Sequence, residues 1–326
     1  MSTLYLDRRN CALDLEGRVL VVSVDGVRET TVPLHLLGRV VLRSNVTLGS
    51  SLLPRLAAAG IAVIAFGGRF GRHHATVLGA THNDAARRVG QLRAYDDPVF
   101  RSRWSRRLCL GKIRAQRRLL NQAAAVRPDQ RHALTKALDA QDQALARLRA
   151  EPGLDAGQLR GIEGAAAAGF FHGYTQLFAP ALDFTGRNRR PPRDPVNAAL
   201  SLGYTLLHAE AVHAAHLAGL DPMVGFYHEL DFGRPSLASD LIEPLRGQVE
   251  QWVWESFRER LLRLEDFTRD GDACLLGKNA RQRYFAAYEI FARPRRRLLR
   301  RWCTKLAVLL GERGRPHATA TATATE

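Results

Sequence analysis

The chain has 326 residues, of which 46% are hydrophobic and 25% are charged, and this composition is typical of a globular protein with about two domains. No stretch approaches the ~18 consecutive apolar residues that cross a bilayer, and Asp7, Arg8 and Arg9 interrupt the N-terminus before a signal-peptide core could form, so we expect a cytoplasmic protein with no membrane partner. Lysine and arginine number 48 against 32 acidic residues, and the net charge of +16 makes a polyanion such as nucleic acid the expected partner.

Residues 1–82 have the pattern of a small, mainly β domain. Short β-branched and apolar runs alternate with turn residues such as Asp25-Gly26 and Gly38, which is typical of strands. Leucines at helical spacing between residues 50 and 59, followed by Gly60, predict one helix. The expected strands are 19–24, 28–34, 39–42, 61–66 and 73–78, with a turn at 67–71.

From residue 83 onward the hydrophobic period is that of helices. Asp194 followed by Pro195 predicts an N-cap and a first-turn proline. The expected helices are 84–95, 98–122, 129–150, 157–178, 195–219, 239–266, 279–292 and 295–310. The sequence therefore predicts an α+β protein with a β-rich N-terminal domain at 1–82, a larger all-α domain at 83–316 and a disordered low-complexity tail at 317–326.

The positions of the cysteines argue against a disulfide-rich domain and against a structural zinc domain. They stand far apart and form no CxxC pair, so neither a disulfide framework nor a local zinc site can be built from them. We expect buried, reduced thiols at Cys11, Cys109, Cys274 and Cys303.

Arginines concentrate in three segments that contain almost no acid, at 101–118, 187–193 and 293–301. A solvated helix face usually mixes charges of both signs, so these segments favour contact with DNA phosphates. The segment 293–310 is also amphipathic, which leaves docking to a membrane surface as the alternative.

Familiar nucleophile and nucleotide motifs are absent, because the chain has no GxSxG, no GxxxxGK[ST] and no GxGxxG that opens a helix after a strand. His228-Glu229 begins like HExxH, but the motif is not completed. Three histidines and a glutamate of one predicted helix could bind a metal, although scattered histidines are more often packed or exposed without a ligand. These residues are His208, His213, His216 and Glu210.

A second set of ligand-type side chains comes from three segments. His228 lies in a glycine-flanked loop, Asp240 and Glu243 lie one turn apart on a predicted helix, and Glu163 lies among small and apolar residues, where an unpaired charge would be costly. Spacing alone leaves two interpretations open. In one, Glu163 pairs with an arginine and Asp240 caps a helix. In the other, Glu163, His228 and Glu243 converge on one divalent ion.

Four colinear motifs resemble those of a known family. They are Gly161-Ile162-Glu163-Gly164, the stretch 190–204, the run 219–228 and the segment 236–243. Together they look like successive motifs of the CRISPR-associated endonuclease/integrase family, the first-numbered Cas protein of spacer acquisition. Residues 41–48 and 59–63 match the β domain of that family more loosely.

The resemblance implies a homodimer that works with the small second-numbered Cas protein to insert short pieces of foreign double-stranded DNA into a CRISPR array. It places metal ligands at Glu163, His228 and Glu243 and a further catalytic acid at Asp240. One nitrogen and two carboxylates suit Mn²⁺ or Mg²⁺ better than zinc, and the attacking group would be a DNA 3′-OH for integration or water for nicking. Two other classes stay open: a repair nuclease that cuts branched DNA without integration, and a non-catalytic DNA-binding protein.

Overall fold

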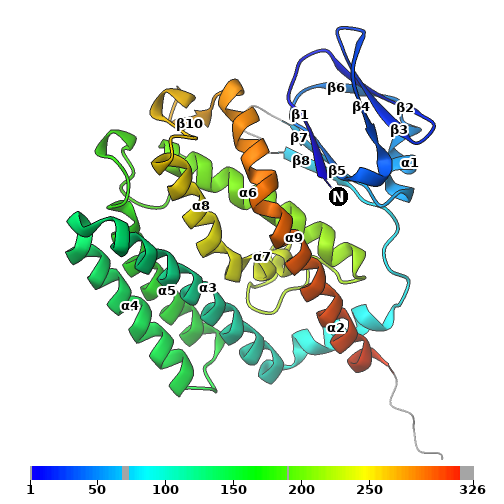
Figure 1. The fold of residues 1–326 in the computed structure, drawn as a ribbon. Coiled ribbons are helices and arrows are strands. Elements are labelled where there is room, and N and C mark those ends of the chain that lie inside the picture. Colours follow the sequence, from blue (N-terminus) through cyan, green and yellow to red (C-terminus); the bar gives the residue numbers. More distant parts are fainter. Residues whose placement is uncertain (1, 68–72, 189–190, 316–326) are drawn as a thin grey trace, which may run out of the picture.

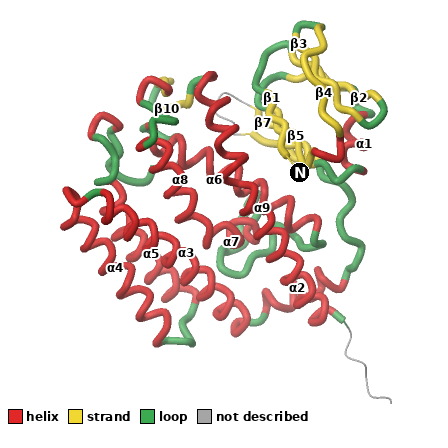
Figure 2. Tube along the Cα trace, viewed as in Figure 1, coloured by secondary structure: helices red, strands yellow, loops and turns green. Residues whose placement is uncertain are grey.

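The computed structural model describes residues 2–67, 73–188 and 191–315. The strands between residues 2 and 77 gather in one body, and helices form most of the rest of the molecule, as Figures 1 and 2 show. The predicted α+β class, with a small β-rich domain followed by a larger helical domain, is confirmed. Most of the predicted turn at 67–71, two arginines of the segment 187–193 and the predicted disordered tail lie outside the described residues.

Two sheets that share one core form the N-terminal domain. In the described residues, one sheet has the order β1 (Ser2–Leu6), β5 (Leu37–Leu42), β7 (Ala62–Gly67), β8 (His73–Val77), with β8 antiparallel to its neighbour and the others parallel. The other has the order β4 (Val27–Pro33), β3 (Val19–Val24), β2 (Cys11–Glu16), β6 (Val46–Leu48). Leu20 of β3, Val40 of β5 and Leu56 of α1 (Leu52–Ala58) are fully buried in the same cluster, so both sheets and α1 pack on one apolar centre.

Long helices dominate the C-terminal domain. They are α2 (Ala86–Asp96), α3 (Pro98–Val126), α4 (Arg131–Ala150), α5 (Ala156–Thr175), α6 (Pro195–Leu217), α7 (Ser236–Ile242), α8 (Arg246–Arg258) and α9 (Lys278–Gly314). Three of these helices begin after an aspartate whose side chain accepts backbone N–H groups of the first turn. The N-caps are Asp97 for α3, Asp155 for α5 and Asp194 for α6. The predicted cap at Asp194 is confirmed. Helices α3, α4 and α5 pack on one another, and α3 also contacts α8.

Two predictions of helices in the C-terminal part were wrong. The expected helix 239–266 is divided into α7, a 3₁₀ turn at Glu243–Leu245 and α8, because Pro244 lacks the N–H that a continuous helix would use. It is followed by a hairpin of β9 (Phe267–Asp270) and β10 (Ala273–Leu276), which was not predicted. Conversely, α9 continues through Pro294, since this proline is exposed and water can solvate the carbonyl that loses its partner.

A buried ionic network joins the two domains. Arg39 of β5 pairs with Glu210 of α6, and Arg296 of α9 donates to both oxygens of Glu210 at 2.8 Å. Arg296 also donates to Glu289 at 2.6 and 2.8 Å, and the Tyr5 hydroxyl of β1 donates to Glu289 at 2.8 Å. Such networks fix geometry more than they add stability. Arg296 therefore belongs to the domain interface and not to the phosphate contacts expected of the segment 293–301.

The cysteine prediction is also confirmed, since all four cysteines are free and buried. Among the described residues, no helix is both long enough and apolar enough to cross a bilayer.

Candidate metal centre

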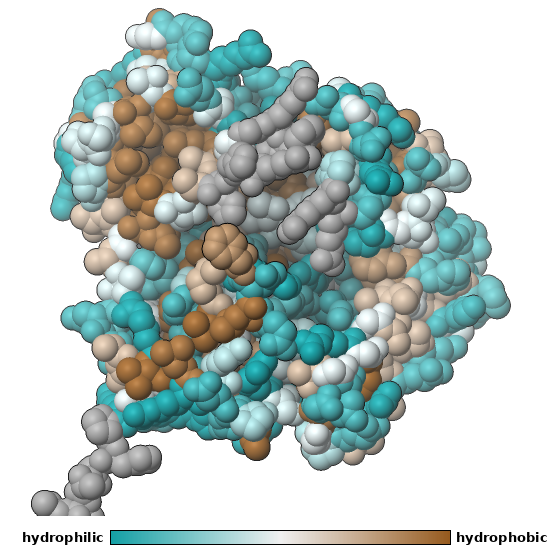
Figure 3. Space-filling model, turned by 180° about the vertical axis from the view of Figure 1, so that it is seen from behind, coloured by the Kyte–Doolittle hydropathy of each residue, from teal (hydrophilic) through white to brown (hydrophobic). Residues whose placement is uncertain are grey.

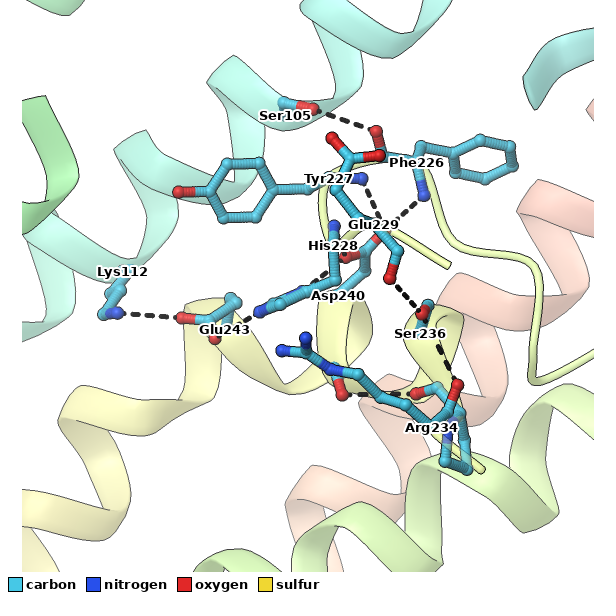
Figure 4. A network of polar contacts seen from close by, with 12 residues as sticks. Ser105, Lys112, Phe226, Tyr227, His228, Glu229, Arg234, Ser236, Asp240 and Glu243 are labelled. Carbon is cyan, nitrogen blue, oxygen red and sulfur yellow. Dashed lines mark hydrogen bonds and ion pairs between the residues drawn. The ribbon is translucent and has the colours of Figure 1, made fainter. Parts of the chain in front are cut away.

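One buried carboxylate shapes the loop that precedes α7. Asp240, in the last turn of α7, has no exposed surface. Its Oδ2 accepts the backbone N–H groups of Phe226 at 2.6 Å and Tyr227 at 3.0 Å, and its Oδ1 accepts that of His228 at 3.0 Å (Figure 4). A Cβ at Gly225 would lie 2.6 Å from the α7 backbone, so glycine permits the loop to pack this closely. The loop is therefore held against α7 by three charge-assisted hydrogen bonds.

The same carboxylate orients the imidazole of His228. Nδ1 lies 2.7 Å from Oδ1 of Asp240, and because a carboxylate only accepts, Nδ1 carries the proton in the neutral ring. The free lone pair is then on Nε2, which lies 3.5 Å from Oε1 of Glu243. Metal-binding histidines commonly donate their other ring N–H to a carboxylate in this way. The His228 ring is thus oriented for a ligand at Nε2.

A lysine ammonium already lies between two of the predicted ligands. Lys112 of α3 contacts Glu163 of α5, and its Nζ lies 3.0 Å from Oε2 of Glu243, the pair that a dashed line joins in Figure 4. A Cβ at Gly111 would lie 2.9 Å from Pro244, so glycine lets α3 approach the turn that carries Glu243. Two carboxylates from different elements therefore converge on one point of positive charge.

Opposite charges keep this cluster ionised despite its burial. Burial favours the neutral form of Glu243, but the positive charges of Arg246 and Lys112 oppose it, and the pKa of Glu243 is lowered to about 2. Burial also disfavours the ammonium of Lys112, yet Glu243 and Glu163 raise its pKa. Oε1 of Glu243 accepts from Nε of Arg246 at 2.7 Å, and the buried Oε2 lies 3.0 Å from the ammonium of Lys112. Glu243 thus retains a negative charge that two cations compensate.

The donor set fits a hard divalent cation. Glu163 and Glu243 supply carboxylate oxygens and His228 supplies one imidazole nitrogen, a combination suited to Mn²⁺ or Mg²⁺. As the side chains stand, no group of three or more His, Cys, Asp or Glu residues in the described part of the chain is arranged to hold a metal ion. Lys112 accounts for this, because its ammonium takes the place of a cation between the glutamates. The side chains of Glu163 and His228 are 20% and 16% exposed, so the centre opens to solvent.

Comparison of the sequence with known proteins identifies the family. The chain matches the family model described as CRISPR associated protein Cas1 over residues 4–290. The chain belongs to the Cas1 family. The CRISPR-associated endonuclease Cas1 1 of Thermodesulfovibrio yellowstonii is 34% identical over 304 residues, which cover 92% of this chain and 94% of that protein. The CRISPR-associated endonuclease Cas1 2 of Rhodospirillum rubrum is 37% identical over 309 residues, with 91% and 88% covered.

Solved structures share the Cas1 fold. A casposase bound to an integration product has a TM-score of 0.81 at 18% identity, with 96% of this chain and 91% of that chain covered. A CAS1 protein from Thermotoga maritima has a TM-score of 0.80 at 19% identity, with 95% and 97% covered. A chain of a Cas6-RT-Cas1–Cas2 complex has a TM-score of 0.80 at 24% identity, with 95% and 35% covered. The family expected from the sequence motifs is confirmed by the family model and the relatives, and these structures have the same fold.

The structure brings the four predicted site residues of this Cas1 protein together but gives them unequal positions. Glu163 and Glu243 contact Lys112, and His228 faces Glu243. Asp240 lies behind His228 and does not reach the exposed edge of the centre. Glu163 pairs with Lys112 and not with an arginine, and Asp240 lies inside α7 and caps no helix, so the first of the two open interpretations was wrong on both points.

The second candidate cluster of the Cas1 chain is not assembled. Glu210 is engaged in the domain interface, and Nε2 of His216 bonds to the carbonyl of residue 79 at 2.7 Å. His213 is buried, and burial together with the nearby Arg39 lowers its pKa to about 3. Glu210, His213 and His216 are therefore held by contacts within the fold, and the described residues form no metal-binding group here.

Two basic residues of the centre were missed in the sequence. Lys112 was grouped with the phosphate-binding candidates of the segment 101–118, and Arg246 was assigned no role. A signal for Lys112 exists, because it is the only lysine in α3, where every other basic residue is arginine. Arg246 follows Glu243 by three residues, which is the spacing of an ion pair on one helical face.

The arginine-rich segments divide into paired and free members. In α3, Arg101 and Arg117 pair with acidic side chains, and Arg106 donates to backbone carbonyls of α4. Four arginines of α3 are exposed and have no polar partner in the described part of the chain, and they fall within about 60° of one helix face over about 22 Å. These are Arg103, Arg107, Arg114 and Arg118, here called the α3 stripe. On α9, Arg293, Arg297 and Arg301 are likewise exposed, with no polar partner within residues 2–67, 73–188 and 191–315.

Proposed function

We propose that this Cas1 protein is a metal-dependent DNA endonuclease and integrase that inserts short foreign DNA fragments into a CRISPR array. The observation that carries the proposal is the convergence of Glu163 of α5 and Glu243 of the 3₁₀ turn on the Lys112 ammonium, with the oriented ring of His228 beside Glu243. Its relatives bear the name endonuclease, and a chain of the same fold is a casposase bound to an integration product.

Glu163, His228 and Glu243 are the residues that would hold Mn²⁺ or Mg²⁺. When bound, the ion supplies polarisation of the scissile phosphodiester and orientation of the attacking oxygen, either a 3′-OH or water. Asp240 keeps Nε2 of His228 available by holding the proton on Nδ1. Lys112 and Arg246 place positive charge beside the same carboxylates, where it can stabilise negative charge that develops on the phosphate.

The expected partners are double-stranded DNA, a second copy of the chain and the small Cas2 protein. Support for DNA comes from the α3 stripe, since exposed arginines without acidic partners are suited to phosphates. Support for a homodimer comes from the broad apolar area over the β-rich domain on the rear face in Figure 3. Insertion of both ends of one fragment also requires two active sites. A chain of the same fold belongs to a Cas1–Cas2 complex, which supports the third partner.

The test mixes the purified protein, its Cas2 partner, a duplex with free 3′-OH ends and a supercoiled repeat plasmid, with Mn²⁺ or Mg²⁺. The expected result is strand-joined product that Glu163→Gln, His228→Ala and Glu243→Gln all abolish. Nicking without joining would select the branched-DNA repair nuclease, and retention of DNA without cleavage would select the non-catalytic DNA-binding protein. Glu312→Gln provides a matched control for the glutamate variants, because Glu312 is an exposed glutamate of α9 outside the centre.

A further inference from the structure

A β-turn between the candidate metal centre and α7 presents an aromatic side chain to solvent. The N–H of Arg234 bonds to the carbonyl of Asp231 at 3.1 Å, and Gly233 has a φ of +68°. A positive φ at the third position defines a type II turn, which glycine adopts without strain. Phe232 occupies the second position, at the tip of the turn. It is 104% exposed, compared with 80% for Ile290, the next most exposed large apolar residue in the described part of the chain.

The ends of the turn-bearing loop are fixed next to the centre. His228, just before the loop, is held by Asp240 through both its backbone and its ring. The hydroxyl of Ser236, at the start of α7, donates to the carbonyl of Glu229 at 2.9 Å and so ties the two ends of the loop together, as Figure 4 shows. The carboxylate of Glu229 pairs with Arg160 of α5 at 2.9 Å and with Arg101 of α3 at 3.4 Å. Phe232 is therefore carried on an anchored loop only four residues beyond His228.

Exposure of one phenylalanine needs no explanation by itself, but three features coincide here. The loop is anchored at both ends, the glycine turn places the ring at its tip, and Arg234 of the same turn is exposed with no acidic partner among the described residues. An exposed ring and an exposed guanidinium on one short turn are suited to single-stranded nucleic acid, in which the ring stacks on a base and the cation contacts a phosphate. A protein partner would have to leave the Arg234 charge uncompensated or supply an acid of its own.

We propose that Phe232 stacks on an unpaired base of the DNA strand next to the phosphate that reacts at the Glu163–His228–Glu243 centre, and that Arg234 contacts the adjoining phosphate. This inference rests on the proposed function, because it requires a DNA strand at the centre. It assigns to the loop a preference for branched or frayed DNA over a fully paired duplex, since only an unstacked base exposes a face to the ring. Phe232 acts as a positioning residue and takes no part in the chemistry.

The test measures binding by fluorescence anisotropy in EDTA, so that no strand is cut. The two probes are a forked DNA with unpaired bases and a fully paired duplex of the same length. Phe232→Ala should weaken binding of the fork by about 5- to 150-fold, the range for loss of one base–aromatic stacking contact, and leave binding of the duplex unchanged. Phe232→Tyr should bind the fork like the wild type, because the aromatic face is retained. Ile290→Ala is the matched control, since it removes an exposed apolar side chain from α9.

Three outcomes separate the inference from the proposed function. If the wild-type protein joins strands and Phe232→Ala binds the fork as tightly as the wild type, the stacking site is overturned and the proposed function stands. If Phe232→Ala loses the preference for the fork and the wild type joins no strands, the stacking site stands and the proposed function fails. If Phe232→Ala changes the mass of the DNA-free protein in light scattering, the ring packs against a second copy, and the inference is overturned.

Discussion

Replacing Lys112 with methionine preserves most of the side-chain length and removes the ammonium that contacts Glu163 and Glu243. Because both carboxylates reach the same nitrogen, they lie roughly 5 Å apart, and at an effective dielectric constant of about 20 two like charges at that separation repel by about 3 kcal/mol. The metal-free variant should therefore be less stable by about 3 kcal/mol. At about 2–4 °C per kcal/mol in domains of comparable size, the melting temperature should fall by several degrees.

The response to metal distinguishes this effect from ordinary loss of a buried side chain. In the wild type an incoming cation must displace the Lys112 ammonium, whereas in Lys112→Met the two glutamates are unpaired and gain their counter-ion from the metal. Calorimetric melting curves recorded over a Mn²⁺ titration should therefore show a larger stabilisation of Lys112→Met than of the wild type.

Lys136→Met is the matched control, because Lys136 is an exposed residue of α4. It should melt like the wild type at every Mn²⁺ concentration. Equal Mn²⁺-induced shifts for Lys112→Met and the wild type would refute the account of Lys112 as the cation that holds the site, even if the variant were destabilised.

Three further predictions concern the supports of the centre, the domain core and the DNA-binding surface. Asp240→Asn replaces one carboxylate oxygen, which accepts two hydrogen bonds, with an amide group that faces the same two donors. Hydrogen bonds to charged groups contribute ~1.5–3 kcal/mol each, so the free energy of unfolding measured in urea should fall by about 3–6 kcal/mol. A loss under ~1 kcal/mol would contradict these hydrogen bonds. Because the pKa of His213 is lowered to about 3, the unfolded chain takes up the proton first as pH falls, and the stability contributed by the neutral ring is complete above pH 6.5 and lost toward pH 3. Between pH 7 and pH 5 the wild type should lose about 2 kcal/mol more than His213→Leu in denaturant titrations, and equal losses would contradict the shift. The logarithm of the binding constant for duplex DNA should fall with the logarithm of salt concentration, with a slope of about 0.9 for each phosphate contact. Replacing all four arginines of the α3 stripe with glutamine should reduce that slope by up to about 4. An unchanged slope would show that the DNA binds elsewhere on the protein.

Local signals predicted much of the helical domain. Asp194 before Pro195 marked the start of α6, because a side-chain cap and a proline at the first position act within one turn. The continuation of α9 through Pro294 was not predictable in this way, since it depends on exposure of the proline and on packing against α2 and α6. Strand β2 was missed because its buried positions alternate with Asp14 and Glu16 and form no apolar run.

The candidate site shows the same division. The motifs placed Glu163, His228 and Glu243 in one neighbourhood, and the fold brings these side chains together. The burial of Asp240 was not predicted, because it depends on the loop that folds back over α7. The position of Lys112 depends on the packing of α3 against the turn that carries Glu243. The burial of Asp240 and the position of Lys112 both depend on contacts between segments far apart in sequence. Such contacts cannot be predicted from the spacing of residues along the chain.

The central claim is that Glu163, His228 and Glu243 form the metal centre of this Cas1 protein. The most direct measurement is an anomalous difference map from crystals soaked in Mn²⁺. The account predicts one peak bounded by the two glutamate carboxylates and Nε2 of His228, with the ammonium of Lys112 moved out of the space between the glutamates. A manganese peak on other side chains, or Lys112 still between Glu163 and Glu243 at saturating Mn²⁺, would contradict it.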